Sequence, residues 1–381
     1  MSSDPTVFIS AGEPSGDLYG GRLAAELRRR LPGAKLLGLG GATMEAAGVE
    51  RLAGLDRLAV MGVAELAGHL PFFLRLRRRV RETVAREGVD LLVAVDYPGF
   101  NLPLVRFASR RGAAVLYYAP PQVWAWRRGR ARRVADRADV VCTVLPFAAE
   151  PFARAGAEVE FVGHPLLDEM EGEPEGRGRG RPGGQDVSDD RSPLLGLFPG
   201  SREQEVRRLL PRMVRAAGRL QGRRSDLEVA VARAPEVPDR AYALPAGVPE
   251  LRPRRVAREA TAALAASGTV TLELAMHGTP MAVAYRMHPL TFALARRLVS
   301  VEHVSLVNLV HRSGLVPELL QERATPERMA DAVDPLLSRG RERRRVLEGL
   351  AEVRGRLGRR GVASRVADRC VGLLDRGRRA A

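Results

Sequence analysis

The chain has 381 residues, enough for two domains of ordinary size, and its 45% hydrophobic content is typical of a globular protein. Its formal net charge of +16 at first favours an anionic partner, either nucleic acid or a membrane surface. All of the 61 basic residues except Lys35 are Arg, however, and the chain has one Ile and two Asn. This bias is typical of GC-rich coding, so much of the charge implies no partner.

Two Cys exclude a disulfide scaffold and a Cys-rich metal site, and we expect Cys142 and Cys370 to be buried thiols. We expect no signal peptide before the first strand pattern, and no apolar run in the sequence is long enough to span a membrane. These features predict a cytoplasmic protein, with a role at a membrane surface still open.

The first half of the chain alternates short apolar runs with amphipathic helical patterns. The runs lie at 6–10, 34–41, 89–96, 113–119 and 138–145. Run 89–96 is continuously apolar, as expected of a strand buried on both faces of a parallel sheet. The alternation predicts a doubly wound parallel sheet over residues 1–170.

Residues 171–193 are rich in Gly and Pro and predict a flexible linker between two domains. A second α/β domain is expected over 194–350, with strands at 193–201, 227–233, 262–268 and 281–286. The segment 351–381 is expected to be a basic helix. The predicted fold class is therefore α/β, with two Rossmann-like parallel-sheet domains that face each other across a cleft.

The segment AGEPSGD, residues 11–17, joins a predicted strand to a helix. Gly12 and Gly16 allow a tight turn and leave room for a ligand at the carboxyl end of the strand. Glu13 is a polar group beside the cleft, and Ser15 or Asp17 could cap the helix. A simple capped turn, without a ligand, remains the alternative.

FPGSREQE, residues 198–205, is a second strand-to-helix junction. Ser201 and Gln204 match the capping box, and a helix N-terminus beside a Gly is a typical anion site. Arg202 opposes the helix dipole there, which makes sense if it binds a phosphate. The alternative is an Arg that points into water.

ASGTVTLELAMHGTP, residues 266–280, is a third such junction, with a small polar loop at Ser267, Gly268 and Thr269. Thr269 and Glu273 are four residues apart and share a helix face. A carboxylate at Glu273 could accept hydrogen bonds from the hydroxyls of a ribose, unless it is an ordinary surface residue. A diphosphate and a ribose together indicate a nucleotide.

Asp96 ends the most apolar strand of the first domain, where a carboxylate can act as a general base on an acceptor hydroxyl. Its alternative role is that of a helix cap. The chain avoids Asn, yet it retains Asn101 just after Asp96 and Asn308 in a loop-like stretch of the second domain. Their retention suggests that both are needed.

Residues 63–82 mix cations with apolar residues that look exposed, a pattern that suits an anionic membrane surface as well as an ordinary core helix. The apolar residues of this segment are Leu66, Leu70, Phe72, Phe73 and Leu74. The chain has no HExxH motif, paired Cys or carboxylate cluster, so we expect neither a metal nor a cofactor.

Nine motifs in this order resemble the lipid-A-disaccharide synthase family of inverting glycosyltransferases. They are AGEPSGD, AVMGVAE (59–65), VDYPGFN, PPQVWAWR, LPFA (145–148), FVGHP, FPGSR, ASGTVTLE and SLVNL. The resemblance, over about residues 7–320, implies a GT-B fold. It also implies transfer of 2,3-diacylglucosamine from UDP to 2,3-diacylglucosamine 1-phosphate, with a β(1→6) disaccharide and UDP as products.

The resemblance also implies roles for matching residues. Asp96 is the candidate base, and residues 1–170 bind the acceptor, with Glu13, Ser15 and Gly16 lining the cleft. The implied UDP contacts are Ser201, Arg202, Ser267, Gly268, Thr269, Glu273 and Asn308. The acyl chains of both substrates give segment 63–82 a purpose at the inner face of the inner membrane, and a homodimer is possible.

Three features depart from the family pattern: Ala148 replaces the usual Glu, the linker 171–193 is unusually rich in Gly and Arg, and segment 232–256 looks shortened, which bears on the uracil pocket. Two alternatives remain. One is a related enzyme, another UDP-sugar transferase or a UDP-N-acetylglucosamine 2-epimerase. The other is an Arg-rich nucleic-acid-binding protein, which the scattered Arg residues and the lack of a recognition module disfavour.

Overall fold

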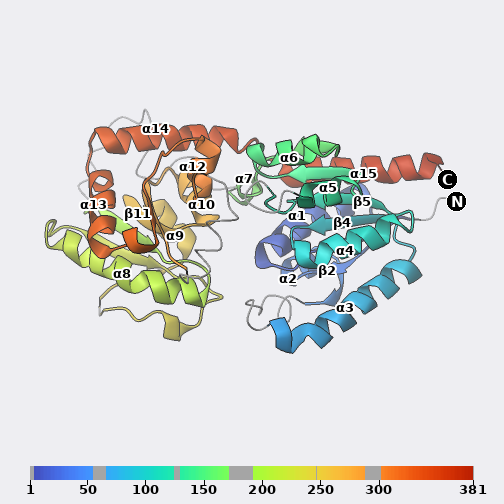
Figure 1. The fold of residues 1–381 in the computed structure, drawn as a ribbon, viewed down its shortest axis with the longest axis horizontal. Coiled ribbons are helices and arrows are strands. Elements are labelled where there is room, and N and C mark those ends of the chain that lie inside the picture. Colours follow the sequence, from blue (N-terminus) through green and yellow to red (C-terminus); the bar gives the residue numbers. More distant parts are fainter. Residues whose placement is uncertain are drawn as a thin grey trace. The chain divides into compact units, whose positions relative to one another are not determined.

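A computed structural model describes residues 4–54, 66–123, 129–170, 192–245, 247–287 and 302–380, with the backbone alone at 66–70 and 378–380. The chain divides into two compact units, Met1–Glu171 with Gly358–Ala381, and Gly172–Leu357. The predicted linker 171–193 lies almost entirely outside the described residues. Each unit is an α/β structure around one parallel sheet, which confirms the predicted fold class of two parallel-sheet domains (Figure 1).

The first unit contains a seven-stranded sheet in the order β3-β2-β1-β4-β5-β6-β7, and each neighbouring pair in it is parallel. Its strands are β1 (Thr6–Ser10), β2 (Lys35–Leu39), β3 (Glu50–Ala53), β4 (Leu91–Val95), β5 (Ala114–Tyr118), β6 (Val140–Thr143) and β7 (Val159–Phe161). Its helices are α1 (Pro14–Arg30), α2 (Ala42–Ala46), α3 (Leu66–Arg86), α4 (Pro98–Ser109), α5 (Gly129–Ala135), α6 (Ala149–Arg154), α7 (Leu166–Glu169) and α15 (Val362–Ala380), with a 3₁₀ turn at Pro146–Ala148.

The second unit contains a six-stranded parallel sheet in the order β10-β9-β8-β11-β12-β13. Its strands are β8 (Leu194–Phe198), β9 (Glu228–Ala232), β10 (Glu250–Leu251), β11 (Ala262–Ala266), β12 (Met281–Tyr285) and β13 (Glu318–Leu320). Its helices are α8 (Glu203–Gln221), α9 (Pro253–Glu259), α10 (Val270–His277), α12 (Leu306–His311), α13 (Pro326–Leu337) and α14 (Arg341–Arg356), with 3₁₀ turns at Asp239–Ala241 and Gln321–Arg323. The shortened segment 232–256 still forms a strand, β10, of two residues.

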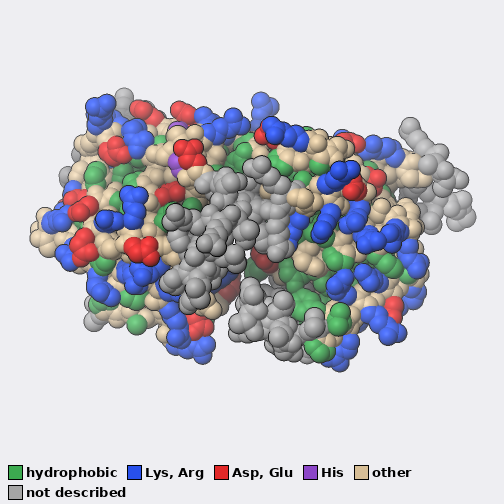
Figure 2. Space-filling view, in the orientation of Figure 1, with side chains coloured by type: hydrophobic (Ala, Val, Ile, Leu, Met, Phe, Trp, Pro, Cys, Tyr) green, Lys and Arg blue, Asp and Glu red, His purple; other side chains and the backbone are tan. Residues whose placement is uncertain are grey.

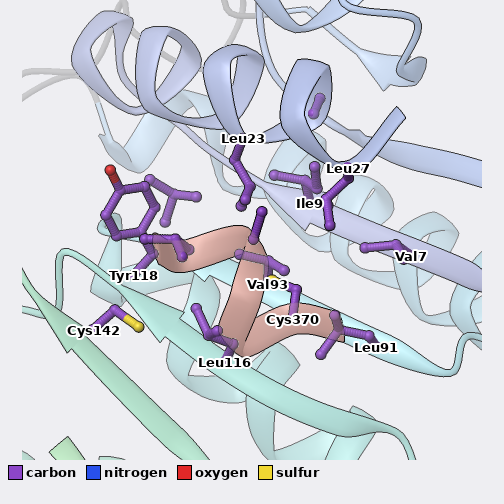
Figure 3. Close-up of a cluster of buried hydrophobic side chains, with 14 of the residues drawn as sticks. Val7, Ile9, Leu23, Leu27, Leu91, Val93, Leu116, Tyr118, Cys142 and Cys370 are labelled. Carbon is purple, nitrogen blue, oxygen red and sulfur yellow. The ribbon is translucent and has the colours of Figure 1, made fainter. Parts of the chain in front are cut away.

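Alternation along the strands of the first sheet produces a core on each face, because successive side chains point to opposite sides. Val7, Ile9, Leu91 and Val93 pack under α1 and α15 (Figure 3). The intervening residues Phe8, Leu92 and Ala94 pack against α3, α4 and α5 on the other face. Both Cys are free and buried, as predicted, and Cys142 and Cys370 belong to the core under α1 and α15.

The basic tail forms two helices, α14 and α15, rather than the single helix expected from residue 351. Gly358, with φ +98°, and Gly361, with φ +84°, adopt the left-handed conformation that favours Gly and separate the two helices. Helix α15 then packs against α1 in the first unit. The carboxylate of Asp168 accepts hydrogen bonds from the N–H groups of Gly361 (2.7 Å) and Ala363 (3.1 Å) at the start of this helix.

We expect Asp168→Ala to lower the free energy of unfolding of the first unit by about 1–3 kcal/mol, because it leaves two amide groups without their acceptor. Urea unfolding, with hydrogen exchange of the α15 amides as a local readout, measures this loss. Asp375→Ala is the matched control, since Asp375 is an exposed carboxylate of the same helix. Equal stability of the two variants would show that the contact does not hold α15.

Candidate active site

The first part of the site lies where the strand order of the first sheet reverses. β1 and β4 are parallel neighbours, and the chain leaves them toward opposite faces of the sheet. Such a switch point, at the carboxyl ends of the strands, is the usual ligand position in open parallel sheets. Glu13 follows β1 there and Asp96 follows β4. The fold therefore brings together two of the predicted site residues.

Asp96 and Tyr97 form an unusual turn between β4 and α4. Their φ angles are 43° and 46°, in the left-handed region that non-Gly residues seldom adopt. Strain of this kind costs about 1–3 kcal/mol per residue and persists where the surroundings enforce it. The Asp96 N–H donates to the Tyr118 carbonyl (3.0 Å), and the Asp96 carbonyl accepts from the Tyr117 hydroxyl (3.0 Å).

Asn101 holds the same turn from inside the unit. Its side-chain amide is fully buried, and its Nδ2 lies 2.8 Å from the Asp96 carbonyl, 3.1 Å from that of Val95 and 3.2 Å from that of Ser10. Its Oδ1 accepts a 2.6 Å hydrogen bond from the Ser10 hydroxyl. Asn101 thus ties the ends of β1 and β4 together and positions Asp96, which gives its retention a structural reason.

Gly12 leaves space for the Tyr97 ring of this turn, a role that the sequence did not predict. A Cβ at Gly12 would lie 2.2–2.5 Å from atoms of the Tyr97 ring. The room predicted for a ligand is therefore filled by Tyr97, whose ring also stacks on Phe100 with the centroids 6.0 Å apart. The contact depends on the left-handed backbone of Tyr97, which the sequence does not show.

The surroundings of Asp96 change its acidity. Burial, followed by the negative charge of Glu13, raises the pKa of the Asp96 carboxyl to about 7. Both effects disfavour the charged form, and burial is the larger. A carboxylate with a pKa near neutrality can accept a proton in a reaction and release it afterwards, so Asp96 is suited to general base catalysis.

The remaining residues of the first loop fall into two groups. Glu13 and Ser15 are exposed beside the switch point, as a ligand-binding role requires. Gly16 is buried, and a Cβ there would contact Ala11 and Val95, so its lack of a side chain allows close packing of α1, while its place on the cleft stays a prediction. Asp17 does not cap α1 but accepts hydrogen bonds from three N–H groups at the start of α2: Gly41, Thr43 and Met44.

The second part of the site repeats this geometry in the second unit. The strand order there reverses between β8 and β11, which are parallel neighbours. The loop after β8 contains Ser201 and Arg202, and the loop after β11 contains Ser267, Gly268 and Thr269. Five predicted nucleotide contacts thus follow the two strands of one switch point.

The loop after β8 differs in detail from its prediction. Helix α8 begins at Glu203 with Arg202 as its N-cap, and no side chain caps it, so the predicted capping box is wrong. Gly200, with φ +115°, makes the turn, and a Cβ there would clash with Glu205. The Arg202 side chain is 77% exposed, with the Glu205 carboxylate 3.7 Å away. Such a guanidinium remains accessible to an anion.

The loop after β11 is held by its own hydroxyl groups. The Thr271 hydroxyl donates to the Gly268 carbonyl (2.9 Å), and the Ser267 hydroxyl donates to the Val304 carbonyl (3.1 Å). Thr269 is exposed as the N-cap of α10, and its carbonyl accepts from the N–H of Glu273. The predicted shared helix face of Thr269 and Glu273 is therefore present.

Asn308 lies in helix α12 rather than in a loop, and its amide is engaged within the chain. Nδ2 donates to the Val316 carbonyl (2.9 Å) and to Glu318 (2.8 Å), while Oδ1 accepts from the Val316 N–H (2.9 Å). Glu318 also accepts from the N–H groups of Val304 and Ser305. Asn308 thus supports the segment that contacts Ser267, and its contact with a nucleotide stays a prediction. Sequence reasoning missed Glu318, because it sits in a short strand without a motif.

Helix α3 carries the predicted membrane-facing residues that the structure describes. Phe72 and Phe73 are half-buried and pack against the core, whereas the Leu74 side chain is 55% exposed beside the exposed Arg75 and Arg79. The side chains of Leu66 and Leu70 lie outside the described residues, as do motif 59–65 and residues 124–128. None of the helices in the described ranges is long and apolar enough to cross a membrane.

Comparison with known proteins supplies the family. The family model described as lipid-A-disaccharide synthetase matches residues 7–361. A lipid-A-disaccharide synthase from Myxococcus xanthus is 38% identical over 99% of this chain and 100% of its own length. Another, from Trichlorobacter lovleyi, is 38% identical over 97% of both chains.

Solved structures agree on the fold at much lower identity. The calicheamicin glycosyltransferase CalG4 superposes with a TM-score of 0.60, at 19% identity and over 99% of both chains. The S. aureus MnaA–UDP structure gives a TM-score of 0.65, at 12% identity and over 97% of both chains. These neighbours share the fold of two parallel-sheet units, and the sequence relatives are far closer, so this chain belongs to the lipid-A-disaccharide synthase family of glycosyltransferases.

Proposed function

We propose that this protein transfers 2,3-diacylglucosamine from its UDP derivative to the 6-hydroxyl of 2,3-diacylglucosamine 1-phosphate with inversion. The observation that carries the proposal is the Asp96 carboxyl, held at the switch point of the first sheet with its pKa raised to about 7. A base of this strength is what deprotonation of a sugar hydroxyl during attack requires. We propose the two substrates from the family to which the chain belongs, and we propose Asp96 as the base in the chemical step.

In the proposed step, the acceptor oxygen forms a bond to the anomeric carbon as its proton moves to Asp96. The bond from that carbon to the phosphate oxygen breaks, and UDP leaves with the electron pair. Negative charge develops on the leaving diphosphate, where Arg202 and the N–H groups at the start of α8 would stabilise it. Ser267 and Thr269 would bind phosphate, and Glu273 would accept hydrogen bonds from the ribose.

The alternatives are less favoured. The 2-epimerases with this fold, such as that from Neisseria meningitidis at 10% identity, share the fold alone, whereas the synthases are 36–38% identical over nearly the whole chain. A nucleic-acid-binding role would rest on the cationic surface. Figure 2 shows cations spread over both units with acidic side chains between them, and no single basic face stands out in this view.

Both substrates carry acyl chains, so the proposal includes contact with an anionic membrane surface through α3. The exposed side of this helix presents Leu74, Arg75, Arg78 and Arg79, and Arg78 pairs with Glu82 at 2.7 Å. Cations of this kind contribute about 1 kcal/mol each near an anionic leaflet. The half-buried Phe72 and Phe73 support the helix from its inner side.

The first test is turnover. The protein is incubated with the two diacylglucosamine substrates, and the disaccharide 1-phosphate is detected by mass. We expect Asp96→Asn to reduce kcat at least a hundredfold, as is typical for loss of a general base, while UDP affinity is unchanged. Asp90→Asn, an exposed carboxylate just before β4, is the control. Absence of disaccharide from the folded wild type would disprove the proposed function, and near-normal turnover of Asp96→Asn would disprove the base.

The second test is the pH dependence of kcat/KM. Asp96 must be ionised to act, so kcat/KM should fall about tenfold per pH unit below about 7. Glu13→Gln removes a negative charge that raises the pKa of Asp96, so the acidic limb should move to lower pH. Glu45→Gln, an exposed carboxylate elsewhere in the unit, should leave the limb in place. If Glu13→Gln leaves the acidic limb of the kcat/KM profile unchanged, Asp96 is not the group that produces this limb.

The third test concerns the membrane surface. Arg75→Gln/Arg79→Gln should weaken binding to vesicles that contain phosphatidylglycerol roughly thirtyfold at low salt, since two cations contribute about 2 kcal/mol there. Co-sedimentation measures the binding. Arg132→Gln/Arg133→Gln, with the same charge change on exposed residues of α5, should bind like the wild type. Equal loss in both double variants would mean that overall charge, not α3, governs the interaction.

A further inference from the structure

A cavity in the second unit carries an unusual concentration of positive charge. It has a volume of about 420 Å³, within the range of roughly 300–1,000 Å³ that holds small ligands. Arg212, Arg215 and Arg219 of α8 line it together with Arg286 after β12. The start of α13, which packs beside α8 (Figure 1), closes the cavity with Thr325 and Glu327.

Elsewhere between the same two helices, the cations of α8 form ion pairs with acids of α13. Further along α8, Arg223 lies 3.1 Å from Asp331 and Arg224 lies 2.7 Å from Asp334, both acids of α13. Arg219, at the edge of the cavity, pairs with Glu327. Each of these three acids of α13 therefore pairs with an Arg of α8, and the Arg219–Glu327 pair is the last of the series, at the cavity.

Inside the cavity the guanidinium groups contact neutral oxygens instead. Arg212 donates to the Arg208 carbonyl (2.6 Å), Arg215 to the Pro211 carbonyl (3.2 Å) and Arg286 to the Gln321 carbonyl (3.3 Å). In the part of the chain that the structure describes, no carboxylate forms an ion pair with any of these three. One carboxylate, Glu327, thus faces four guanidinium groups.

These cations also repel one another. Burial, followed by the charges of Arg286 and Arg215, lowers the pKa of the Arg212 guanidinium. Like charges held together in a partly dehydrated hollow destabilise the fold unless an anion joins them. Arg presents several N–H groups in a rigid plane and binds phosphate oxygens in pairs, so the cluster suits a phosphate better than a carboxylate on a side chain.

We propose that this cavity is a second anion site, which binds a phosphomonoester group through Arg212, Arg215 and Arg286. The candidate UDP contacts Ser201, Arg202, Ser267, Gly268 and Thr269 do not line it, so the proposal does not rest on the proposed function. A phosphate on a lipid headgroup and a free phosphate present the same chemistry. The cavity would take either through the same guanidinium groups.

Calorimetric titration of the full chain with inorganic phosphate, at constant ionic strength, tests the site. We expect a saturable site in the wild type that is at least tenfold weaker in Arg212→Gln/Arg286→Gln. Arg223→Gln/Arg255→Gln removes the same charge from exposed, ion-paired residues and should bind like the wild type. Arg202→Gln should also keep the site, which separates it from phosphate bound at the candidate UDP loop.

Both cavity substitutions relieve repulsion, so we expect the double variant to remain folded, and Arg215→Gln at an exposed residue gives a second, milder test. Water-soluble dihexanoyl phosphatidic acid is the lipid probe, with dihexanoyl phosphatidylcholine as its neutral counterpart. Tighter binding of the phosphatidic acid than of phosphate identifies a lipid headgroup, and equal binding identifies a free phosphate. Equal phosphate affinity in the cavity variant and its control would overturn the proposal.

Discussion

Parallel pairing of every strand is the constraint on which both halves of the site depend. In a parallel sheet all strands end at one edge, so loops that are far apart in the sequence become neighbours there. Residues 13 and 96 meet at the reversal between β1 and β4, and residues 202 and 267 follow the two strands at the reversal between β8 and β11. The same topology thus places the Asp96 carboxylate at the switch point of one unit and the candidate anion-binding loop at the switch point of the other.

The turn at Asp96 shows what this placement costs the fold. Asp96 and Tyr97 are strained in the left-handed region, and the Asp96 carboxyl is partly removed from water. Its pKa rises from 3.8 to about 7, so between these values the folded state keeps a proton that the unfolded state releases. Its contribution to stability therefore falls as the pH rises through this window, by at most about 4 kcal/mol and by less because the group is partly exposed. Asn101, Tyr117 and Tyr118 offset this cost through hydrogen bonds to the backbone of the turn.

The sequence predicted the inner strands of both sheets and missed their outer ones, for a physical reason. Central strands are buried on both faces and read as continuous apolar runs, as in β4 and β11. The four strands that were missed, β3, β7, β10 and β13, are the edges of the two sheets. Each is short and carries a Glu, because one of its sides is not enclosed by neighbours.

The candidate site, like the fold, could be predicted from the sequence only in part. Loops at strand ends could be predicted from the strand patterns and from Gly and hydroxyl residues, so the positions of Asp96, Arg202 and Ser267 after their strands were predicted from the sequence alone. The residues that hold those loops come from elsewhere in the chain and have no local signal: Tyr97 fills the space at Gly12, and Glu318 holds residues 304–305. At Gly16 the sequence does not separate two roles, because a helix packed closely on a strand needs Gly for the same reason that a ligand does.

The net charge of +16 acquires a different meaning once the partners of the cations are known. Many Arg residues are exposed and pair with acids one helical turn away, as Arg78 does with Glu82 and Arg154 with Glu150. Such surface pairs contribute little to stability and imply no ligand. A cation is informative where the fold brings it beside more cations than acids, because folding alone gives no reason to gather like charges. By this criterion the cavity at Arg212 and Arg286 stands apart from the rest of the basic surface, although all of it shares one composition.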